Sequence, residues 1–470
     1  MKKDTRGPNC ADRVLPMLIL SCLLWVPLLS FKEAKAQASG IDGQSTNSAP
    51  HSTQFIKLIN NLENEGISFN SRYLGEFASN PTGGQRQGAD FAGELNFGAN
   101  VSLNKLVGLR GGSLTILFTA RNGRDLSADT INNSVPVQQI FGDGQTYQLT
   151  LFTYNQEFFG NKVKVSFGRT ELANSFFESP LYCQFQSNAL CGRPYVLGKD
   201  VAASFYPLAV WGGDISIDPS PNYYIHAGIY QSNPTLNPVS SHGFNWNISK
   251  SNGFLIPVEI GYRRHVDGGM ANDRYDVGVI FDRTHFTSPI YDSNGGLYLL
   301  TQLPPAEEYG RTAFYVQAQQ MVYQDQKEKE RNVYAFAGAL FGLSGNKQVA
   351  RYGGEVGVVD NGPLAWRPRD SLDVGVGMIH YSTSYINTLY DLRLSSGGVE
   401  RPHQNLIMAE INYNLQINNW LAVMPNLQYV VHPDGLGREP YPLSNVPNAF
   451  VAGIQFNVDV ARVIGQVGGQ

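Results

Sequence analysis

The sequence predicts an all-β chain that closes into a transmembrane antiparallel β-barrel of about sixteen strands. Charged residues make up 16% of the 470 residues, whereas soluble domains average ~25%. No apolar run after residue 31 is long enough for a membrane-spanning helix. Apolar and polar side chains instead alternate in many segments of about 9–13 residues. Strands of that length cross a bilayer when tilted, so the alternation favours a membrane barrel.

The N-terminal residues predict export. Four basic residues, ending with Arg13, precede an apolar run over 14–31, and the small-residue sequence Ala34-Lys35-Ala36 follows. This order is that of a secretory signal peptide over residues 1–36. An uncleaved anchor is the alternative, but two prolines interrupt the run. Removing 1–36 takes away six basic and three acidic side chains and moves the formal net charge from −4 to about −7, which disfavours nucleic acid as a partner.

Residues 37–66 predict a flexible segment followed by a short helix. The segment is rich in Ser, Gly and Asn up to residue 52, and Gly66 provides a stop signal. Apolar residues recur between them at helical spacing, which predicts an amphipathic helix at or near one mouth of the barrel. These residues are Phe55, Ile56, Leu58, Ile59 and Leu62.

From residue 67 to residue 460 the apolar period changes to two, which predicts the barrel itself, with 461–470 as a C-terminal tail. The sixth segment is blurred, since two stretches within 199–217 each read as a strand. The expected strands cover 67–78, 90–103, 113–121, 145–158, 161–168, 199–217, 222–231, 253–265, 273–282, 312–324, 331–342, 351–360, 371–382, 404–416, 420–431 and 447–460.

Connections between these segments alternate between short and long, as in barrels with short periplasmic turns and long outer loops. The link 343–350 is short where a long one is expected. A β-sandwich has no reason to sort its loops in this way. An even strand number puts both ends of the barrel on the periplasmic side, and sixteen strands leave an aqueous lumen. The long connections follow odd-numbered segments and cover 122–144, 169–198, 232–252, 283–311, 383–403 and 432–446.

The stretch Gly168–Pro194 carries the two cysteines that remain after export, Cys183 and Cys191. In an exported chain this pair predicts a disulfide. A two-cysteine metal site is the alternative, but no histidine lies nearby, and neither a metal nor another cofactor is expected. The stretch follows the fifth strand and mixes aromatic residues with charges of both signs. We therefore expect it to fold into the barrel and narrow it, with the disulfide holding Glu178 and Arg193 across the channel.

Alternation also places many charged side chains on the lumen side of the expected strands. The alternative is that they only hydrate the wall. The residues are Arg72, Glu76, Glu94, Arg121, Lys162, Lys164, Glu259, Arg263 and Glu410.

Several stretches resemble the carbohydrate-selective porins of Gram-negative outer membranes, the OprB type. The resemblance begins with GISFNSRYLGEFASNPTGGQRQGADF, continues through FGRTELANSFFESPLYCQFQSNALCGRP and NGFLIPVEIGYR, and covers most of residues 66–460. It implies a sixteen-stranded, trimeric channel in outer-membrane lipid, through which mono- and disaccharides diffuse passively.

A sugar channel needs hydrogen-bonding groups and aromatic faces at its narrowest point, with weak binding. We expect Arg169, Glu171, Glu178 and Arg193 to form the constriction and Trp246 to offer a stacking surface for sugar. An enzyme is not expected, because the eight histidines are scattered and no catalytic motif appears. Two alternatives stay open, a general or anion-preferring porin, suggested by Lys162, Lys164 and the arginines, and a structural or adhesive surface barrel.

Overall fold

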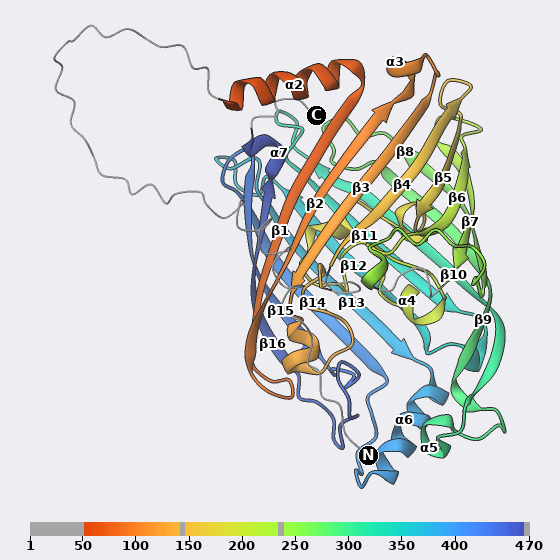
Figure 1. The fold of residues 1–470 in the computed structure, drawn as a ribbon. Coiled ribbons are helices and arrows are strands. Elements are labelled where there is room, and N and C mark those ends of the chain that lie inside the picture. Colours follow the sequence, from red (N-terminus) through yellow and green to blue (C-terminus); the bar gives the residue numbers. More distant parts are fainter. Residues whose placement is uncertain (1–50, 142–145, 234–238, 465–470) are drawn as a thin grey trace, which may run out of the picture. The chain divides into compact units, whose positions relative to one another are not determined.

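The computed structural model describes residues 51–141, 146–233 and 239–464. The predicted signal peptide and most of the predicted tail lie outside these residues. Within them, sixteen strands form one closed antiparallel barrel in which every strand pairs with its sequence neighbours and β1 pairs with β16 (Figure 1). Closure leaves no strand edge unpaired, as a lipid environment requires. The all-β barrel prediction is confirmed.

The strands have the following bounds: β1 Ile67–Thr82, β2 Gly88–Ser102, β3 Gly112–Gly123, β4 Tyr147–Phe158, β5 Val163–Thr170, β6 Val210–Ile217, β7 Tyr223–Ser232, β8 Gly253–Arg264, β9 Asp273–Asp292, β10 Pro305–Gln324, β11 Asn332–Gly342, β12 Ala350–Asn361, β13 Ser371–Tyr381, β14 Asn405–Gln416, β15 Leu421–Val431 and β16 Ala449–Asp459.

Side chains on successive strand positions face opposite sides of the wall, as the alternation predicts. On β12, Val356 and Val358 are exposed on the outer face, whereas Glu355 faces inward and is buried. On β2, Phe97 is exposed and Glu94 is buried. The outer face is thus an apolar band suited to lipid, and the polar side chains face inward.

The α-helices other than α4 mark the two ends of the barrel. The predicted N-terminal helix is present as α2 and contacts β1. In Figure 1 it lies at the same end as α3 and α7, which we call the periplasmic end, and α5 and α6 lie at the opposite, extracellular end. Among the described residues, no helix is long and apolar enough to cross a membrane. The α-helices are α2 His51–Glu65, α3 Leu103–Val107, α4 Leu197–Asp200, α5 Tyr298–Thr301, α6 Thr383–Ser395 and α7 Val460–Val463.

Three strand boundaries differ from the prediction by more than four residues. The sixth strand begins at Val210, because residues 199–209 belong to the preceding connection. The N–H of Ala202 there donates to the carboxylate of Asp282 on β9 and not to the backbone of a neighbouring strand. The ninth and tenth strands are 20 residues long and continue past the predicted ends. The pairing between these extended ends of β9 and β10 contains two register shifts. The regular alternation that marks a spanning strand is therefore interrupted there, and the sequence does not predict the extension.

The two faces of β3 offer a matched test of this orientation. Ile116 pairs with Phe152 on the outer face, whereas its neighbour Leu117 lines the lumen. We expect Ile116→Arg to lower the free energy of unfolding by about 2–4 kcal/mol, because arginine is costly at the bilayer midplane. Leu117→Arg, which adds a cation to an aqueous lumen, should cost much less. Urea unfolding in lipid vesicles measures both, and equal losses would contradict the assigned faces.

Candidate functional site

The connection 171–209, which joins β5 to β6 and carries α4, lies inside the barrel. Its residues contact inward-facing side chains and backbone from strands on several sides of the wall. Gln186 Nε2 donates to the carbonyl of Phe77 on β1 (3.3 Å), and Asn426 of β15 donates to the Gln186 side chain (2.7 Å). Tyr182 reaches β10 through Gln317 (3.2 Å). We call residues 171–209 the inner loop, and its inward fold agrees with the prediction for Gly168–Pro194.

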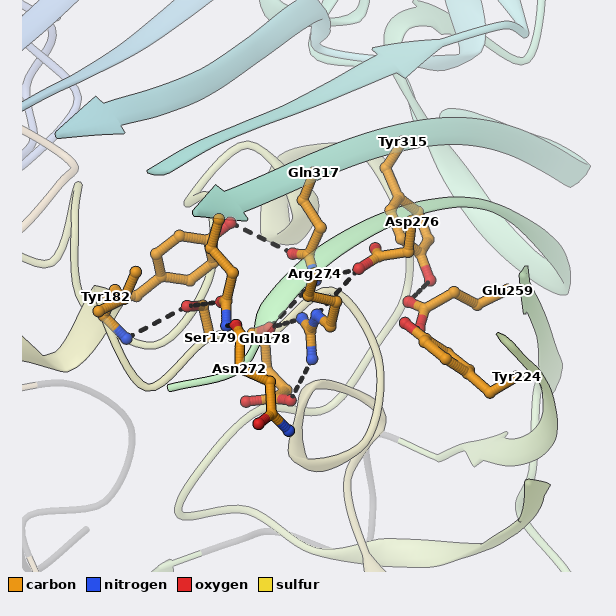
Figure 2. A network of polar contacts seen from close by, with 12 residues as sticks. Glu178, Ser179, Tyr182, Tyr224, Glu259, Asn272, Arg274, Asp276, Tyr315 and Gln317 are labelled. Carbon is orange, nitrogen blue, oxygen red and sulfur yellow. Dashed lines mark hydrogen bonds and ion pairs between the residues drawn. The ribbon is translucent and has the colours of Figure 1, made fainter. Parts of the chain in front are cut away.

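The inner loop is fixed to β9 and β10 by a polar network around Arg274 (Figure 2). The Arg274 guanidinium forms an ion pair with the Glu178 carboxylate (3.0 Å), donates to the Glu178 carbonyl, and pairs with Asp276 (2.9 Å). Gln317 Nε2 donates to the same Glu178 carbonyl (3.1 Å), and Ser179 Oγ donates to Gln319 (2.5 Å). One arginine therefore binds both the side chain and the backbone of the loop.

A second attachment is made by Glu410 of β14. Its carboxylate oxygens accept the backbone N–H groups of Gln186 (2.9 Å) and Ser187 (2.7 Å), and Asn412 also donates to it (3.1 Å). Glu410 faces inward as predicted, but the loop covers it, and it is only 2% exposed. Its observed contacts attach the loop and do not line an open channel.

The space left between the inner loop and the wall of β1–β3 is a cavity of about 780 Å³. We call it the constriction cavity. The β3–β4 connection contributes Pro136, Gln139 and Phe141 to its lining. The wall contributes Arg72, Glu94, Asn96, Leu117 and Arg121, and the inner loop contributes residues that include Glu171, Glu178, Cys183, Arg193, Phe205 and Tyr206.

Charges in the wall of this cavity are largely paired. Arg121 Nε lies 2.5 Å from Glu94 Oε2, and both side chains are 4% exposed. The Tyr206 hydroxyl bridges Glu94 Oε1 (3.0 Å) and Asn96 Oδ1 (2.7 Å), and its ring lies 5.1 Å from the Arg121 guanidinium. Arg72 differs, because it is exposed and no ion-pair partner for it is found among the described residues. The wall thus offers a neutralised cluster of hydrogen-bonding groups beside the cationic side chain of Arg72.

On the loop side, Glu171 is buried and Arg193 is half-buried. Burial raises the pKa of Glu171 to about 7, although the positive charge of Arg193 and backbone N–H groups favour ionisation. The Arg193 guanidinium stacks 3.7 Å from the ring centroid of Phe205, and burial lowers its pKa. Glu171 therefore changes charge near neutral pH, within the cavity.

Other predicted lumen residues face inward but serve different contacts. Glu76 accepts the N–H of Ile140 (3.3 Å) and is fully buried. Glu259 accepts the hydroxyls of Tyr224 (2.7 Å) and Tyr315 (2.6 Å). Arg263 forms an ion pair with Asp218 and, together with Lys164, lines a separate side cavity of about 430 Å³. The structure does not bring these residues into the constriction cavity.

Arg169 and Trp246 do not lie in the constriction, and the prediction for these two residues is wrong. Arg169 pairs across the sheet with Phe152 and Trp211, on the face that carries the exposed Phe167. Trp246 packs against the rings of Phe152 and Trp211, with centroids 5.5 and 5.6 Å apart. The residues around Trp246 therefore cover part of the outer face. Strand parity alone places Arg169 outward, because it lies two residues after Phe167.

Tyr206 was missed by the sequence analysis, since it fell within the blurred sixth segment. The following Pro207 was the available signal, because proline cannot donate a ladder hydrogen bond and is rare within inner strands. No local sequence signal marks three further lining residues, Asn96, Leu117 and Gln139. Their place in the cavity depends on which parts of the chain face the inner loop.

The two cysteines of the inner loop lie close together, with sulfur atoms 3.1 Å apart. Cys191 is buried and Cys183 is exposed toward the constriction cavity. The disulfide between them stays a prediction that this proximity favours.

A closed barrel with an apolar outer band, an inward-folded loop and a polar cavity defines a diffusion channel of the bacterial outer membrane, a porin. The family model "Carbohydrate-selective porin, OprB family" matches residues 86–459, and the chain belongs to this family. The resemblance stated from sequence motifs is thereby confirmed.

Individual relatives agree with the family. Porin B of Pseudomonas aeruginosa is 28% identical over 410 residues, which cover 84% of this chain and 87% of that protein. The putative porin QuiX of Acinetobacter baylyi is 25% identical over 85% of this chain and 90% of its own length. The high-pH structure of Pseudomonas putida OprB is 27% identical and superimposes with a TM-score of 0.77 over 85% of this chain and 95% of that one.

We predict that Arg274→Met loosens the inner loop. The substitution leaves the buried Asp276 carboxylate without its ion-pair partner, and breaking a buried ion pair costs about 3–5 kcal/mol. Single-channel recordings should show a larger and noisier conductance, and proteases should cut within 171–209 faster. The matched control is Arg367→Met, which removes the ion pair with Asp370 in a periplasmic turn. Conductance equal to that of the unmodified channel would argue against the attachment.

We also predict a pH-dependent ion preference that depends on Glu171. Because its folded-state pKa is raised to about 7, the carboxyl is neutral at pH 6 and adds a negative charge at pH 8. The protonated form of Glu171 stabilises the folded channel at low pH, and this stabilisation is lost as the pH rises through 7. Reversal potentials should therefore shift toward cations between pH 6 and 8. The shift should vanish in Glu171→Gln and persist in Glu439→Gln, which changes an exposed carboxyl in the β15–β16 connection.

Proposed function

We propose that the chain is a passive channel for mono- and disaccharides, with the constriction cavity as its selectivity region. The observation that carries this proposal is the cluster of Glu94, Arg121, Tyr206 and Asn96. Its charges cancel within the wall, while its amide and hydroxyl groups remain beside the path. A neutral polyol exchanges hydrogen bonds with such a surface, and a single ion gains little from it.

Aromatic side chains complete the surface that a sugar requires. Phe141, Phe205 and Tyr206 line the cavity together with the polar cluster. Rings of this kind present flat apolar faces to the C–H face of a pyranose, while the polar groups bond its hydroxyls. Arg72 on the wall and Glu178 on the inner loop also place opposite charges on the two sides of the cavity, and the transverse field between them disfavours apolar solutes. The cavity therefore supports passage of sugars without a catalytic step.

Arg72 supports the second candidate, an anion-preferring porin, because it faces the cavity without an ion-pair partner among the described residues. Glu178 offsets this charge in part, since its carboxylate also lines the cavity. We further propose a homotrimer in the membrane, an expectation that rests on the family resemblance. Native mass spectrometry of the solubilised channel distinguishes one subunit from three.

Removing a single hydroxyl tests the sugar assignment. Tyr206→Phe keeps the ring and deletes the group that bridges Glu94 and Asn96. A hydrogen bond contributes about 0.5–1.5 kcal/mol, so block of the ion current by maltose should weaken roughly two- to tenfold. Salt conductance should change little. Tyr309→Phe, at an exposed ring near the extracellular end, is the control.

Three outcomes would separate the candidates. Block of the unmodified channel by glucose or maltose supports a sugar channel, and strong anion preference without sugar block supports the anion-preferring porin. A barrel that conducts no ions would be structural or adhesive.

A further inference from the structure

A second cavity, of about 540 Å³, lies at the periplasmic end of the lumen. It shares Arg72, Asn96 and Leu117 with the constriction cavity. Because the same side chains line both spaces, a solute that leaves the constriction enters this second cavity next. We call it the exit cavity.

The exit cavity is lined by an exposed tryptophan, Trp420. Trp420 lies two residues before Ala422, whose side chain is buried on the inner face together with Met424. Outward-facing residues of β15, such as Leu427 and Tyr429, are exposed on the lipid side, whereas Trp420 lines the exit cavity from the turn before this strand. Trp420 therefore faces the lumen, and it is not a lipid-anchoring residue of the interfacial belt.

The turn that carries Trp420 is held by hydrogen bonds on both sides. Asn418 Oδ1 accepts the N–H groups of Trp420 (2.9 Å) and Leu421 (3.0 Å). The Trp420 carbonyl accepts the N–H of Asp459 (2.9 Å). Arg462 of α7 donates to the Asn419 carbonyl (2.7 Å) and pairs with Asp459 (3.1 Å). The backbone of the turn is thus ordered before any solute arrives, which lowers the entropic cost of binding.

The indole itself is available for a ligand. It is 37% exposed, and its Nε1 has no hydrogen-bond acceptor among the described residues. The amides of Asn96, Asn457 and Gln416 and the guanidinium of Arg72 surround the same space. A flat apolar face ringed by hydrogen-bonding groups matches the two surfaces of a pyranose, and 540 Å³ lies within the range of small-ligand sites.

We propose that Trp420 is the stacking platform of a second carbohydrate subsite, in series with the constriction, for a pyranose ring that leaves toward the periplasm. The proposal rests on the proposed sugar channel. Two weak sites in series let one sugar occupy the exit while the next occupies the constriction, as conduction requires. It follows that sugar added from the periplasmic side meets Trp420 first, so the subsite should affect block from that side more strongly.

The experiment compares Trp420→Ala, Trp420→Phe and Trp366→Ala in the full-length channel, with maltose added to either side of a planar bilayer. Trp366 is a matched control, because it is 75% exposed in another periplasmic turn and lines neither cavity. We expect Trp420→Ala to weaken periplasmic-side block about three- to tenfold, as loss of an aromatic contact implies, with a smaller effect from the extracellular side. Trp420→Phe should retain block within about twofold, and Trp366→Ala should match the unmodified channel.

Tryptophan fluorescence gives a second reading that does not depend on conductance. Maltose should change the emission of the unmodified channel and of Trp366→Ala, and this change should disappear in Trp420→Ala. If block and fluorescence in Trp420→Ala equal those of the unmodified channel, or if periplasmic and extracellular block weaken equally, the subsite is overturned while the sugar channel stands. If maltose does not block the unmodified channel, the proposed function fails first.

Discussion

The attachment of the inner loop to β9, β10 and β14 decides the shape of the lumen. A sixteen-stranded barrel is wide, so a polar cavity of a few hundred cubic ångströms exists only if something fills the rest. Arg274 holds both the carboxylate and the carbonyl of Glu178, and Glu410 accepts two consecutive N–H groups of the loop. These contacts hold the loop across the lumen. The open path is consequently confined to the space between the loop and the wall of β1–β3.

This arrangement explains why the inward-facing charged residues have two different roles. Carboxylates beneath the loop, such as Glu410 and Glu259, are buried, and backbone N–H groups or tyrosine hydroxyls satisfy them. A buried charge without such partners would be costly. The hydrogen bonds of these carboxylates therefore hold the structure together and are not available to a solute. Glu94 and Arg121 lie on the uncovered wall, where they pair with each other and leave Tyr206 and Asn96 beside the path. Whether an inward-facing charged residue holds the inner loop or borders the path therefore depends on its position relative to the loop, and not on its charge alone.

Much of the fold was predictable because the environment of a membrane barrel constrains its local sequence. Lipid on one face and water on the other impose a period of two, which located the strands and the inward side of Glu76, Glu94 and Glu410. The same rule fails where lipid is absent, as in the extended ends of β9 and β10 and in residues 199–209. The site was less predictable, because contacts such as Arg274 with Glu178 join residues about 100 positions apart. Trp246 shows the converse error, since a long loop can fold outward over the wall as readily as inward.

The two cavities along β1 also bear on how a passive channel can be selective and still fast. Strong discrimination at one point would require tight binding, and tight binding would slow release. The constriction cavity supplies paired charges and a bridging hydroxyl, whereas the exit cavity supplies an indole on a turn held by Asn418 and Arg462. Arg72 and Asn96 belong to both linings, so a solute never has to leave one set of hydrogen bonds completely before it gains the next. Dividing the interaction between neighbouring weak sites lowers each barrier to release, and the shared residues provide the physical link between them.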